Sequence, residues 1–284
     1  MKKISFLVFI LLTNLLLAQN NTILWKITSN ETNSVSYLLG NFHQIGDSFI
    51  DKYPIIEEKI KNSDLVILET EELSAKNIIN LRKENYEIND NFNAEELKNL
   101  KKLTSYHTSL LYKYTPIELS WKLQQEYTKR VCGSINSNDK FDDFDNYIYY
   151  LAKKNKIQTM GFATMEEQVE NLNKQYQHVT WKSEKNNIIF YLYNLTKEKI
   201  IKTQVCDDVS NYVKLNIDYK FESSCDFLDV LLTERNNRWI EELLPLLKTK
   251  NTFISVGYFH LGYKCGLINQ LKKSGYKVEP VKMK

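Results

Sequence analysis

The four residues of Leu65–Leu68 are all apolar, and this short run constrains the fold more than any other segment. A strand with one face in solvent alternates apolar and polar residues, whereas an uninterrupted apolar strand is covered on both faces. Such strands are typical of parallel sheets in α/β proteins. Before the run, we expect strands at residues 22–28 and 35–40. A helix is expected at residues 50–62, with Asp51 as its N-cap and Pro54 in its first turn. The order strand, helix, strand predicts a right-handed βαβ unit.

The end of the chain returns to the same pattern after a long helical stretch. Helices are expected at residues 144–154, over most of 166–217, at 227–248 and at 261–274, and strands at 157–161, 252–256 and 276–279. Pro245 should kink the third of these helices or end it early. The pattern predicts one α/β domain over residues 20–284. Its central mixed sheet is built from both ends of the chain, with a helical insertion at about 71–250.

The beginning of the chain has the features of a secretory signal peptide. Met1-Lys2-Lys3 is basic, Ile4–Leu17 is mostly apolar, and the chain turns polar after Ala18. We therefore expect a signal peptide at residues 1–19 with cleavage beside Ala18, and an exported protein that is periplasmic or secreted. The apolar run is shorter than the roughly 20 residues that a membrane-spanning helix needs. No later segment is apolar over such a length, so no transmembrane segment is expected after signal removal.

The charge balance limits the kinds of partner. Lys and Arg total 38 against 35 Asp and Glu, a formal net charge of +3, and removal of Lys2 and Lys3 leaves +1. A nearly balanced surface gives no electrostatic reason to expect nucleic acid or anionic lipid as a partner. The composition, 43% hydrophobic and 26% charged, is that of an ordinary globular protein rather than a disordered one.

The four cysteines are Cys132, Cys206, Cys225 and Cys265. An even number of cysteines in an exported chain permits disulfides, with three possible pairings. The nearest pair in sequence, Cys206–Cys225, is slightly favoured, and four buried thiols are the alternative. There is no Cys-x-x-Cys motif, which excludes a zinc ribbon or a thioredoxin-like redox site.

Two Gly-x-x-His motifs follow predicted strands. They are Gly40-Asn41-Phe42-His43 and Gly257-Tyr258-Phe259-His260, in a chain with only 8 glycines and 4 histidines. Loops at the carboxyl ends of neighbouring parallel strands converge at one crevice, so the two imidazoles should lie close together. Glu69 follows the strand Leu65–Leu68 at the same edge. Two imidazoles and a carboxylate form a typical ligand set for a catalytic metal ion. A lone Gly-x-x-His is more simply a structural loop, whereas the matched pair with Glu69 favours a metal site.

This constellation resembles the TraB/GumN family, which includes the Tiki proteins. The resemblance extends in order along most of the chain, through Tyr37–His43, Tyr53-Pro54, Ser63–Val66 with Glu69, Phe144–Tyr147 with Ala152, Gly161–Gln168, Arg235-Asn236 with Trp239, Gly257–Gly262 and Gly275–Val278. It implies an α/β core shared with the erythromycin-esterase and ChaN-like proteins. It also implies a metal-dependent protease in which His43, His260 and Glu69 hold the metal. Arg235 matches a family arginine that could stabilise an oxyanion.

The sequence also departs from the family pattern. Ala163 stands where the family usually has a glutamate, Asn41 where it usually has threonine, and Tyr258 and Phe259 where it usually has small residues. These two aromatic side chains should narrow the crevice or give it an apolar floor. His107 and His178 lie in polar helical segments and are expected at the surface.

The expected function is therefore an exported metal-dependent hydrolase, a peptidase using a metal-activated water, with Glu69 and Arg235 in catalytic roles. Its substrate would be a peptide or a small carbonyl-containing compound. The expected cofactor is a divalent ion, and mixed nitrogen and oxygen ligands suit Zn, Mn, Co or Fe equally. Two alternatives stay open. One is a non-catalytic envelope protein that binds peptide or polysaccharide, and the other is an ester hydrolase. The sequence leaves the oligomeric state undetermined.

Overall fold

The computed structural model describes residues 22–71, 74–104, 110–196, 200–226 and 229–283. The expected signal peptide lies outside these residues. Within them, the strands are β1 (Leu24–Thr28), β2 (Val35–Asn41), β3 (Leu65–Leu68), β4 (Gln158–Gly161), β5 (Thr252–Gly257) and β6 (Lys277–Pro280). They form one sheet in the order β4-β3-β5-β2-β1-β6. β4, β3, β5 and β2 are parallel, and β1 is antiparallel to both of its neighbours. The predicted α/β class with a mixed sheet is confirmed.

The two ends of the chain meet in this sheet. β5 lies between β2 and β3, and β6 pairs with β1. The Thr22 hydroxyl donates a hydrogen bond to the Val281 carbonyl at 2.7 Å, which closes the same edge. The Leu65–Leu68 run is fully buried, as its composition predicts. β4, which lies within the stretch from 71 to 250, pairs with β3, so this largely helical stretch supplies the outermost strand.

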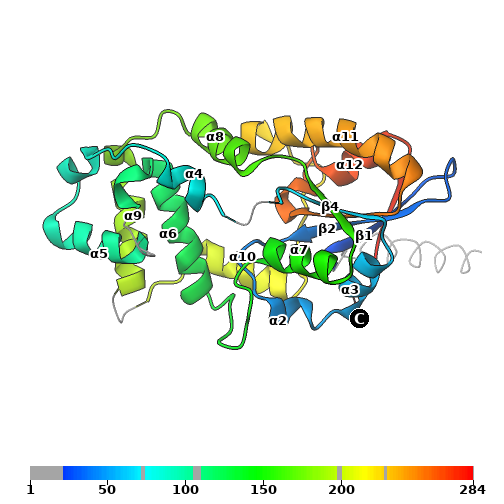
Figure 1. The fold of residues 1–284 in the computed structure, drawn as a ribbon, viewed down its shortest axis with the longest axis horizontal. Coiled ribbons are helices and arrows are strands. Elements are labelled where there is room, and N and C mark those ends of the chain that lie inside the picture. Colours follow the sequence, from blue (N-terminus) through cyan, green and yellow to red (C-terminus); the bar gives the residue numbers. More distant parts are fainter. Residues whose placement is uncertain (1–21, 72–73, 105–109, 197–199, 227–228, 284) are drawn as a thin grey trace, which may run out of the picture.

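The described helices cover both faces of the sheet and form a separate lobe beside it (Figure 1). They are α2 (Asp47–Ile50), α3 (Pro54–Lys61), α4 (Lys76–Asn80), α5 (Ala94–Thr104), α6 (Pro116–Arg130), α7 (Phe144–Lys154), α8 (Met165–Gln175), α9 (Trp181–Thr196), α10 (Gln204–Val213), α11 (Arg235–Thr249) and α12 (Leu267–Lys273). Right-handed crossovers place α3 and α7 on one face of the sheet and α11 and α12 on the other.

Two predicted helix starts are wrong, and the third helix does not end early at its internal proline. The helix expected at 50–62 begins only at Pro54, as α3, and Asp51, its expected N-cap, is instead the C-cap of α2. Tyr53 has φ −124° and ψ 74°, because a residue before proline avoids the helical region. The helix expected from residue 261 begins only at Leu267. Helix α11 continues through Pro245 to Thr249. Pro245 is exposed and frees only the carbonyl of Glu241, which is also exposed, so water can replace the missing hydrogen bond.

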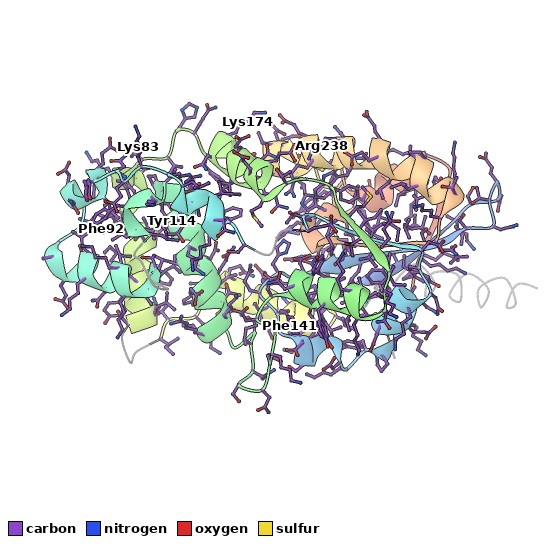
Figure 2. The ribbon with its side chains drawn as sticks, viewed as in Figure 1. Lys83, Phe92, Tyr114, Phe141, Lys174 and Arg238 are labelled. Carbon is purple, nitrogen blue, oxygen red and sulfur yellow. A yellow bond between two sulfur atoms is a disulfide. The ribbon has the colours of Figure 1, made fainter. Side chains whose placement is uncertain are left out.

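The protein has two main hydrophobic cores. The larger surrounds the sheet and includes Trp25, Phe144, Trp239 and Phe253. The second belongs to the helical lobe, which consists mainly of α5, α6 and α9, with a core of Ile88, Phe92, Leu100, Leu111, Leu119, Leu123, Trp181, Ile188 and Leu192. Figure 2 shows Phe92 within this lobe, far from Arg238 on α11. Each part therefore buries its own apolar surface.

A buried carboxylate ties the helical lobe together. Glu118 on α6 accepts two hydrogen bonds from the Arg82 guanidinium, at 2.7 and 3.0 Å, and one from the Asn173 amide of α8 at 2.6 Å. It also accepts from the backbone N–H of Thr115, which completes a capping box at the start of α6. Its side chain is 4% exposed. One carboxylate thus satisfies groups from three parts of the lobe.

The four cysteines form two disulfides, Cys132–Cys206 and Cys225–Cys265. The favoured pairing Cys206–Cys225 is wrong, as is the alternative of four free thiols. Proximity in sequence misleads here because α10 carries Cys206 toward the end of α6, whereas Cys225 lies beside the loop after β5. None of the described helices combines the length and the apolar character needed to cross a membrane.

Candidate functional site

The predicted site residues meet at the carboxyl ends of three parallel strands. His43 follows β2, Glu69 follows β3, and His260 ends the short 3-10 helix Tyr258–His260 that follows β5. β2 and β5 are neighbours, with Asn41 in register with Gly257, and β3 lies on the other side of β5. The topology thus places all three side chains at one edge of the sheet.

Both imidazole rings face the same carboxylate oxygen. The Nε2 atoms of His43 and His260 each lie 3.8 Å from Oε1 of Glu69. Glu69 and His260 are buried, with side chains 8% and 7% exposed, whereas the His43 side chain is 42% exposed. The group is therefore open to solvent on the His43 side.

The motif glycines allow this close approach. A Cβ atom on Gly257 would lie 3.1 Å from His43 Nε2 and 3.2 Å from Glu69 Oε1, which is tighter than ordinary packing. The Gly257 N–H also donates to Oε1 at 2.7 Å. A Cβ on Gly40 would lie 2.8 Å from the Leu261 side chain. In each motif, a larger residue than glycine would therefore press on the side chains at the site or beside it.

Each histidine is held through its Nδ1 atom. His43 Nδ1 lies 2.5 Å from Oδ2 of Asp145, in the first turn of α7. Asp145 in turn accepts from the Asn41 amide at 2.7 Å. His260 Nδ1 lies 2.6 Å from Oδ1 of Asn236 on α11. Histidines that bind metals usually donate the other ring N–H to such an acceptor.

Arg235 contacts Oε2 of Glu69, the carboxylate oxygen that does not face the two histidines. It begins α11, directly after the π-helical turn Asp229–Glu234. One guanidinium nitrogen contacts Glu69 Oε2 at 2.5 Å, and the other lies 3.4 Å from His260 Nε2. The guanidinium also stacks 4.5 Å from the centre of the Trp239 ring. π-Helical turns are rare and often lie at functional sites, because they redirect the side chains that follow.

The surroundings shift the pKa values of the two histidines in opposite directions. Partial burial by itself lowers the pKa of His43, but the Asp145 carboxylate and Glu69 outweigh this and raise the pKa to about 10. Burial is the main cause that lowers the pKa of His260 to about 3, and Arg235 and His43 add to it. Burial would raise the pKa of Glu69, but Arg235 and the two rings hold it well below its usual range. The surroundings thus favour the protonated ring at His43 and the neutral ring at His260.

The donor set fits a divalent ion in its chemistry. Glu69 presents Oε1 to the two rings and Oε2 to Arg235, so an ion and the guanidinium could share the carboxylate. The 3.8 Å separations exceed the roughly 3.4 Å between two tetrahedral ligands of zinc. In the part of the chain that the structure describes, no group of three or more His, Cys, Asp or Glu side chains is arranged closely enough to hold a metal. Ligation by His43 would release its proton.

The positions that depart from the family pattern lie around this group. Tyr258 stacks on Phe42 with ring centres 5.8 Å apart, and Phe259 is 43% exposed. A cavity of about 300 Å³ at the ends of β3 and β4 is lined by Thr70, Glu71, Gly161, Phe162, Ala163, Thr164 and Glu167. A larger cavity of about 580 Å³ lies in the helical lobe, and neither His43 nor His260 lines it. The cavity at Ala163 begins directly after Glu69 in the chain, since Thr70 and Glu71 line it.

The structure adds two residues to which the sequence reasoning gave no role, Asp145 and Asn236. Both belong to segments that carry the family resemblance, yet only the tertiary structure shows that they contact the histidine rings. Of the other histidines, His178 is exposed as expected, and His107 lies outside the described residues.

Comparison with known proteins identifies one family. A sequence profile described as the TraB/PrgY/gumN family matches residues 23–280, which is nearly the whole chain. A search among proteins with curated descriptions finds no match.

Proposed function

Because the chain belongs to the TraB/PrgY/gumN family, we propose that it is a hydrolase that uses a divalent metal ion bound by His43, His260 and Glu69. The observation that carries the proposal is the placement of both Nε2 atoms 3.8 Å from one oxygen of Glu69. Both Nδ1 atoms are occupied by other acceptors, so each ring turns Nε2 toward this shared space. Peptide bonds are the proposed substrate.

Each residue has a distinct role in this proposal. The ion would supply Lewis-acid polarisation of a carbonyl group and activation of water. Asp145 and Asn236 orient the rings, and Glu69 balances the positive charges around it. Arg235 donates from a site shielded from water, where it can stabilise negative charge that develops on a carbonyl oxygen. The exposed edge of His43 gives the substrate its path of approach.

Export is part of the same proposal. The basic and apolar start of the chain supports it, and so do the two disulfides, because disulfides persist in oxidising compartments. Cell fractionation with mass spectrometry of the mature N-terminus tests it. Cleavage beside Ala18 and recovery from the periplasm or medium are expected, whereas an intact N-terminus in the cytoplasm would contradict export.

The second candidate is a non-catalytic protein that binds a peptide or polysaccharide in the same crevice. Ala163 favours it, because the cavity of about 300 Å³ lies where the family usually has a carboxylate. The existing pair of Glu69 with Arg235 favours it as well, since this pair satisfies the carboxylate without an ion.

Metal analysis combined with variants separates the candidates. Purified protein is tested for bound metal, then titrated with Zn²⁺, Mn²⁺, Co²⁺ and Fe²⁺ after chelation, and assayed on peptide and ester libraries. His43→Ala and His260→Ala should lose both metal binding and turnover, whereas the control His178→Ala should retain both. Wild-type protein that binds no metal, or turnover that survives both site substitutions, would refute the proposal. Turnover of esters alone would reassign the substrate. Ligand binding that persists after chelation, with no turnover even when metal is present, would support the second candidate.

A further inference from the structure

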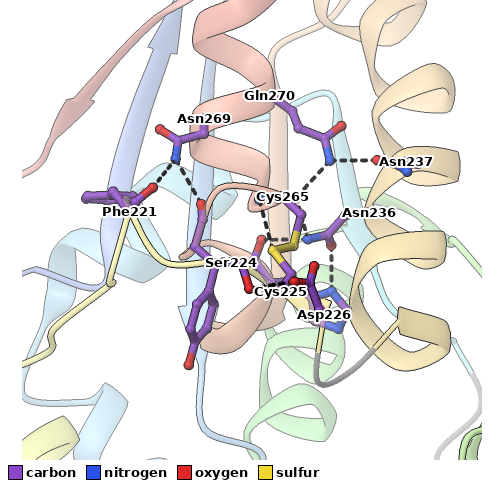
Figure 3. Close-up of a disulfide and its surroundings, with 11 residues drawn as sticks. Phe221, Ser224, Cys225, Asp226, Asn236, Asn237, Cys265, Asn269 and Gln270 are labelled. Carbon is purple, nitrogen blue, oxygen red and sulfur yellow. Dashed lines mark hydrogen bonds between the residues drawn. A yellow bond between two sulfur atoms is a disulfide. The ribbon is translucent and has the colours of Figure 1, made fainter.

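Asn236 is completely buried between His260 and a loop that is closed by a disulfide. Its Nδ2 group lies 3.0 Å from the carbonyl oxygen of Cys265 and 3.3 Å from that of His260. Its Oδ1 atom faces the His260 ring at 2.6 Å from Nδ1. Figure 3 shows the Asn236 side chain beside the Cys225–Cys265 disulfide.

These contacts fix the orientation of the amide group. Carbonyl oxygens only accept hydrogen bonds, so the side of Asn236 that faces the two carbonyls must be the NH₂ group. The opposite atom is therefore the amide oxygen, which also only accepts. The His260 Nδ1 atom must then carry the proton, because otherwise two acceptors would face each other in a buried site. In the neutral ring, Nε2 keeps its lone pair and turns it toward Glu69 and Arg235.

The loop that orients Asn236 is itself held firmly. The Cys225–Cys265 disulfide closes it, and the Cys265 N–H lies 3.0 Å from the sulfur of Cys225. The Cys265 carbonyl also accepts from the Gln270 amide at 2.7 Å, as Figure 3 shows. Gly262 packs so closely on the backbone of Tyr219 that a Cβ atom would lie 2.3 Å from its carbonyl oxygen.

We propose that Asn236 is a positioning residue that fixes the tautomer of His260, and that the disulfide-closed loop holds Asn236 in the required orientation. The proposal deepens the proposed function, because it concerns the same site. It assigns Asn236 no contact with substrate. Its consequence is that His260 presents an unprotonated nitrogen to the shared space before any ion or substrate arrives.

Nitrogen NMR of the histidine rings tests this in protein kept free of metal with a chelator. The chain has only four histidines, and the His260→Ala spectrum assigns the signal of interest. In the wild type, we expect a protonated Nδ1 and an unprotonated Nε2 for His260. Asn236→Ala should shift the ring to a mixture with protonated Nε2. The control Glu241→Ala, on the exposed face of the same helix, should change nothing.

A second comparison tests the contribution of the disulfide. Cys225→Ser/Cys265→Ser should also shift His260 toward a mixture, whereas Cys132→Ser/Cys206→Ser should not, and circular dichroism verifies that each variant is folded. A wild-type ring protonated at Nε2, or an unchanged tautomer in Asn236→Ala, would overturn the role of Asn236. An unchanged signal in the first cysteine variant would overturn the role of the disulfide. Because the readout needs neither metal nor turnover, its failure is distinct from failure of the proposed function.

Discussion

Removal of the Glu69 charge should destabilise the protein more than removal of the Arg235 charge. The two side chains are 8% and 10% exposed, so they form a buried ion pair. Glu69→Gln leaves one acceptor oxygen, which cannot accept from both Arg235 and the Gly257 N–H, and it removes the counter-charge of the guanidinium. The other contacts of the guanidinium are long, 3.4 Å to the Leu231 carbonyl and to His260, and its Nε atom has no hydrogen-bond partner among the described residues. Breaking a buried ion pair by removing one partner lowers the free energy of unfolding by about 3–5 kcal/mol.

The opposite substitution leaves a better-supported charge. In Arg235→Gln, Glu69 still accepts from the Gly257 N–H at 2.7 Å and lies near the protonated His43 ring. The expected cost is therefore smaller, about 1–3 kcal/mol. The double variant should cost less than the sum of the two, because neither charge is then left alone in the interior.

Urea unfolding measures these differences. The experiment is done with a chelator present, so that only the contacts of the chain contribute, and is analysed where circular dichroism and tryptophan fluorescence give the same transition. Glu234→Gln is the control, since its pair with Lys174 is more than half exposed on both sides and should contribute less than about 1 kcal/mol. If Glu69→Gln cost no more than Arg235→Gln, or if both cost less than the control, the assignment of a buried and asymmetric pair would be wrong.

Three further predictions concern stability. Burial raises the pKa of Glu118, but Arg82 and the other donors outweigh it and lower the pKa from 4.5, so its contribution is present above that value and is lost as the pH falls below it. Glu118→Gln should cost about 2 kcal/mol near neutral pH by urea unfolding, and the cost should shrink below about pH 4; a constant cost would contradict the ion pair. A bound divalent ion should stabilise the wild type by about 2.7 kcal/mol at a free concentration of 100 times its Kd, as measured by thermal unfolding. At a fixed ion concentration, the stabilisation should be larger at high pH, because His43 must release its proton and the Kd therefore falls as the pH rises. A stabilisation at fixed concentration that does not change with pH would argue against His43 as a ligand. Cys132→Ser/Cys206→Ser should cost 2–5 kcal/mol, since the disulfide constrains an unfolded loop with a separation of 74 residues. Equal stability of this variant and the oxidised wild type in chemical unfolding would contradict that expectation.

The sequence predicts those features that depend on a local pattern. An uninterrupted apolar run identifies the buried strand Leu65–Leu68, and the two Gly-x-x-His motifs identify loops that converge because their strands are parallel neighbours. The placement of Glu69 follows from the same rule. These predictions need only the direction and neighbourhood of strands, which short sequence signals contain.

Other features depend on contacts between distant segments. Asp145 and Asn236 contact the histidine rings only because α7 and α11 begin beside the strand ends, and no spacing in the sequence indicates this. The disulfide pairs depend likewise on the path of the chain between them. The break before Pro54 was within reach of the sequence, since the restriction that proline imposes on the preceding residue is local.

The central position of β5 affects when the protein can fold during synthesis. β2 and β3 have no direct pairing with each other, and both hydrogen-bond to a strand that begins at Thr252. A ribosome must therefore translate and release Thr252–Gly257 before the middle of the sheet can close. Until then, β2 and β3 each keep an edge without hydrogen-bond partners. The site also stays incomplete, because His260 is translated more than two hundred codons after His43.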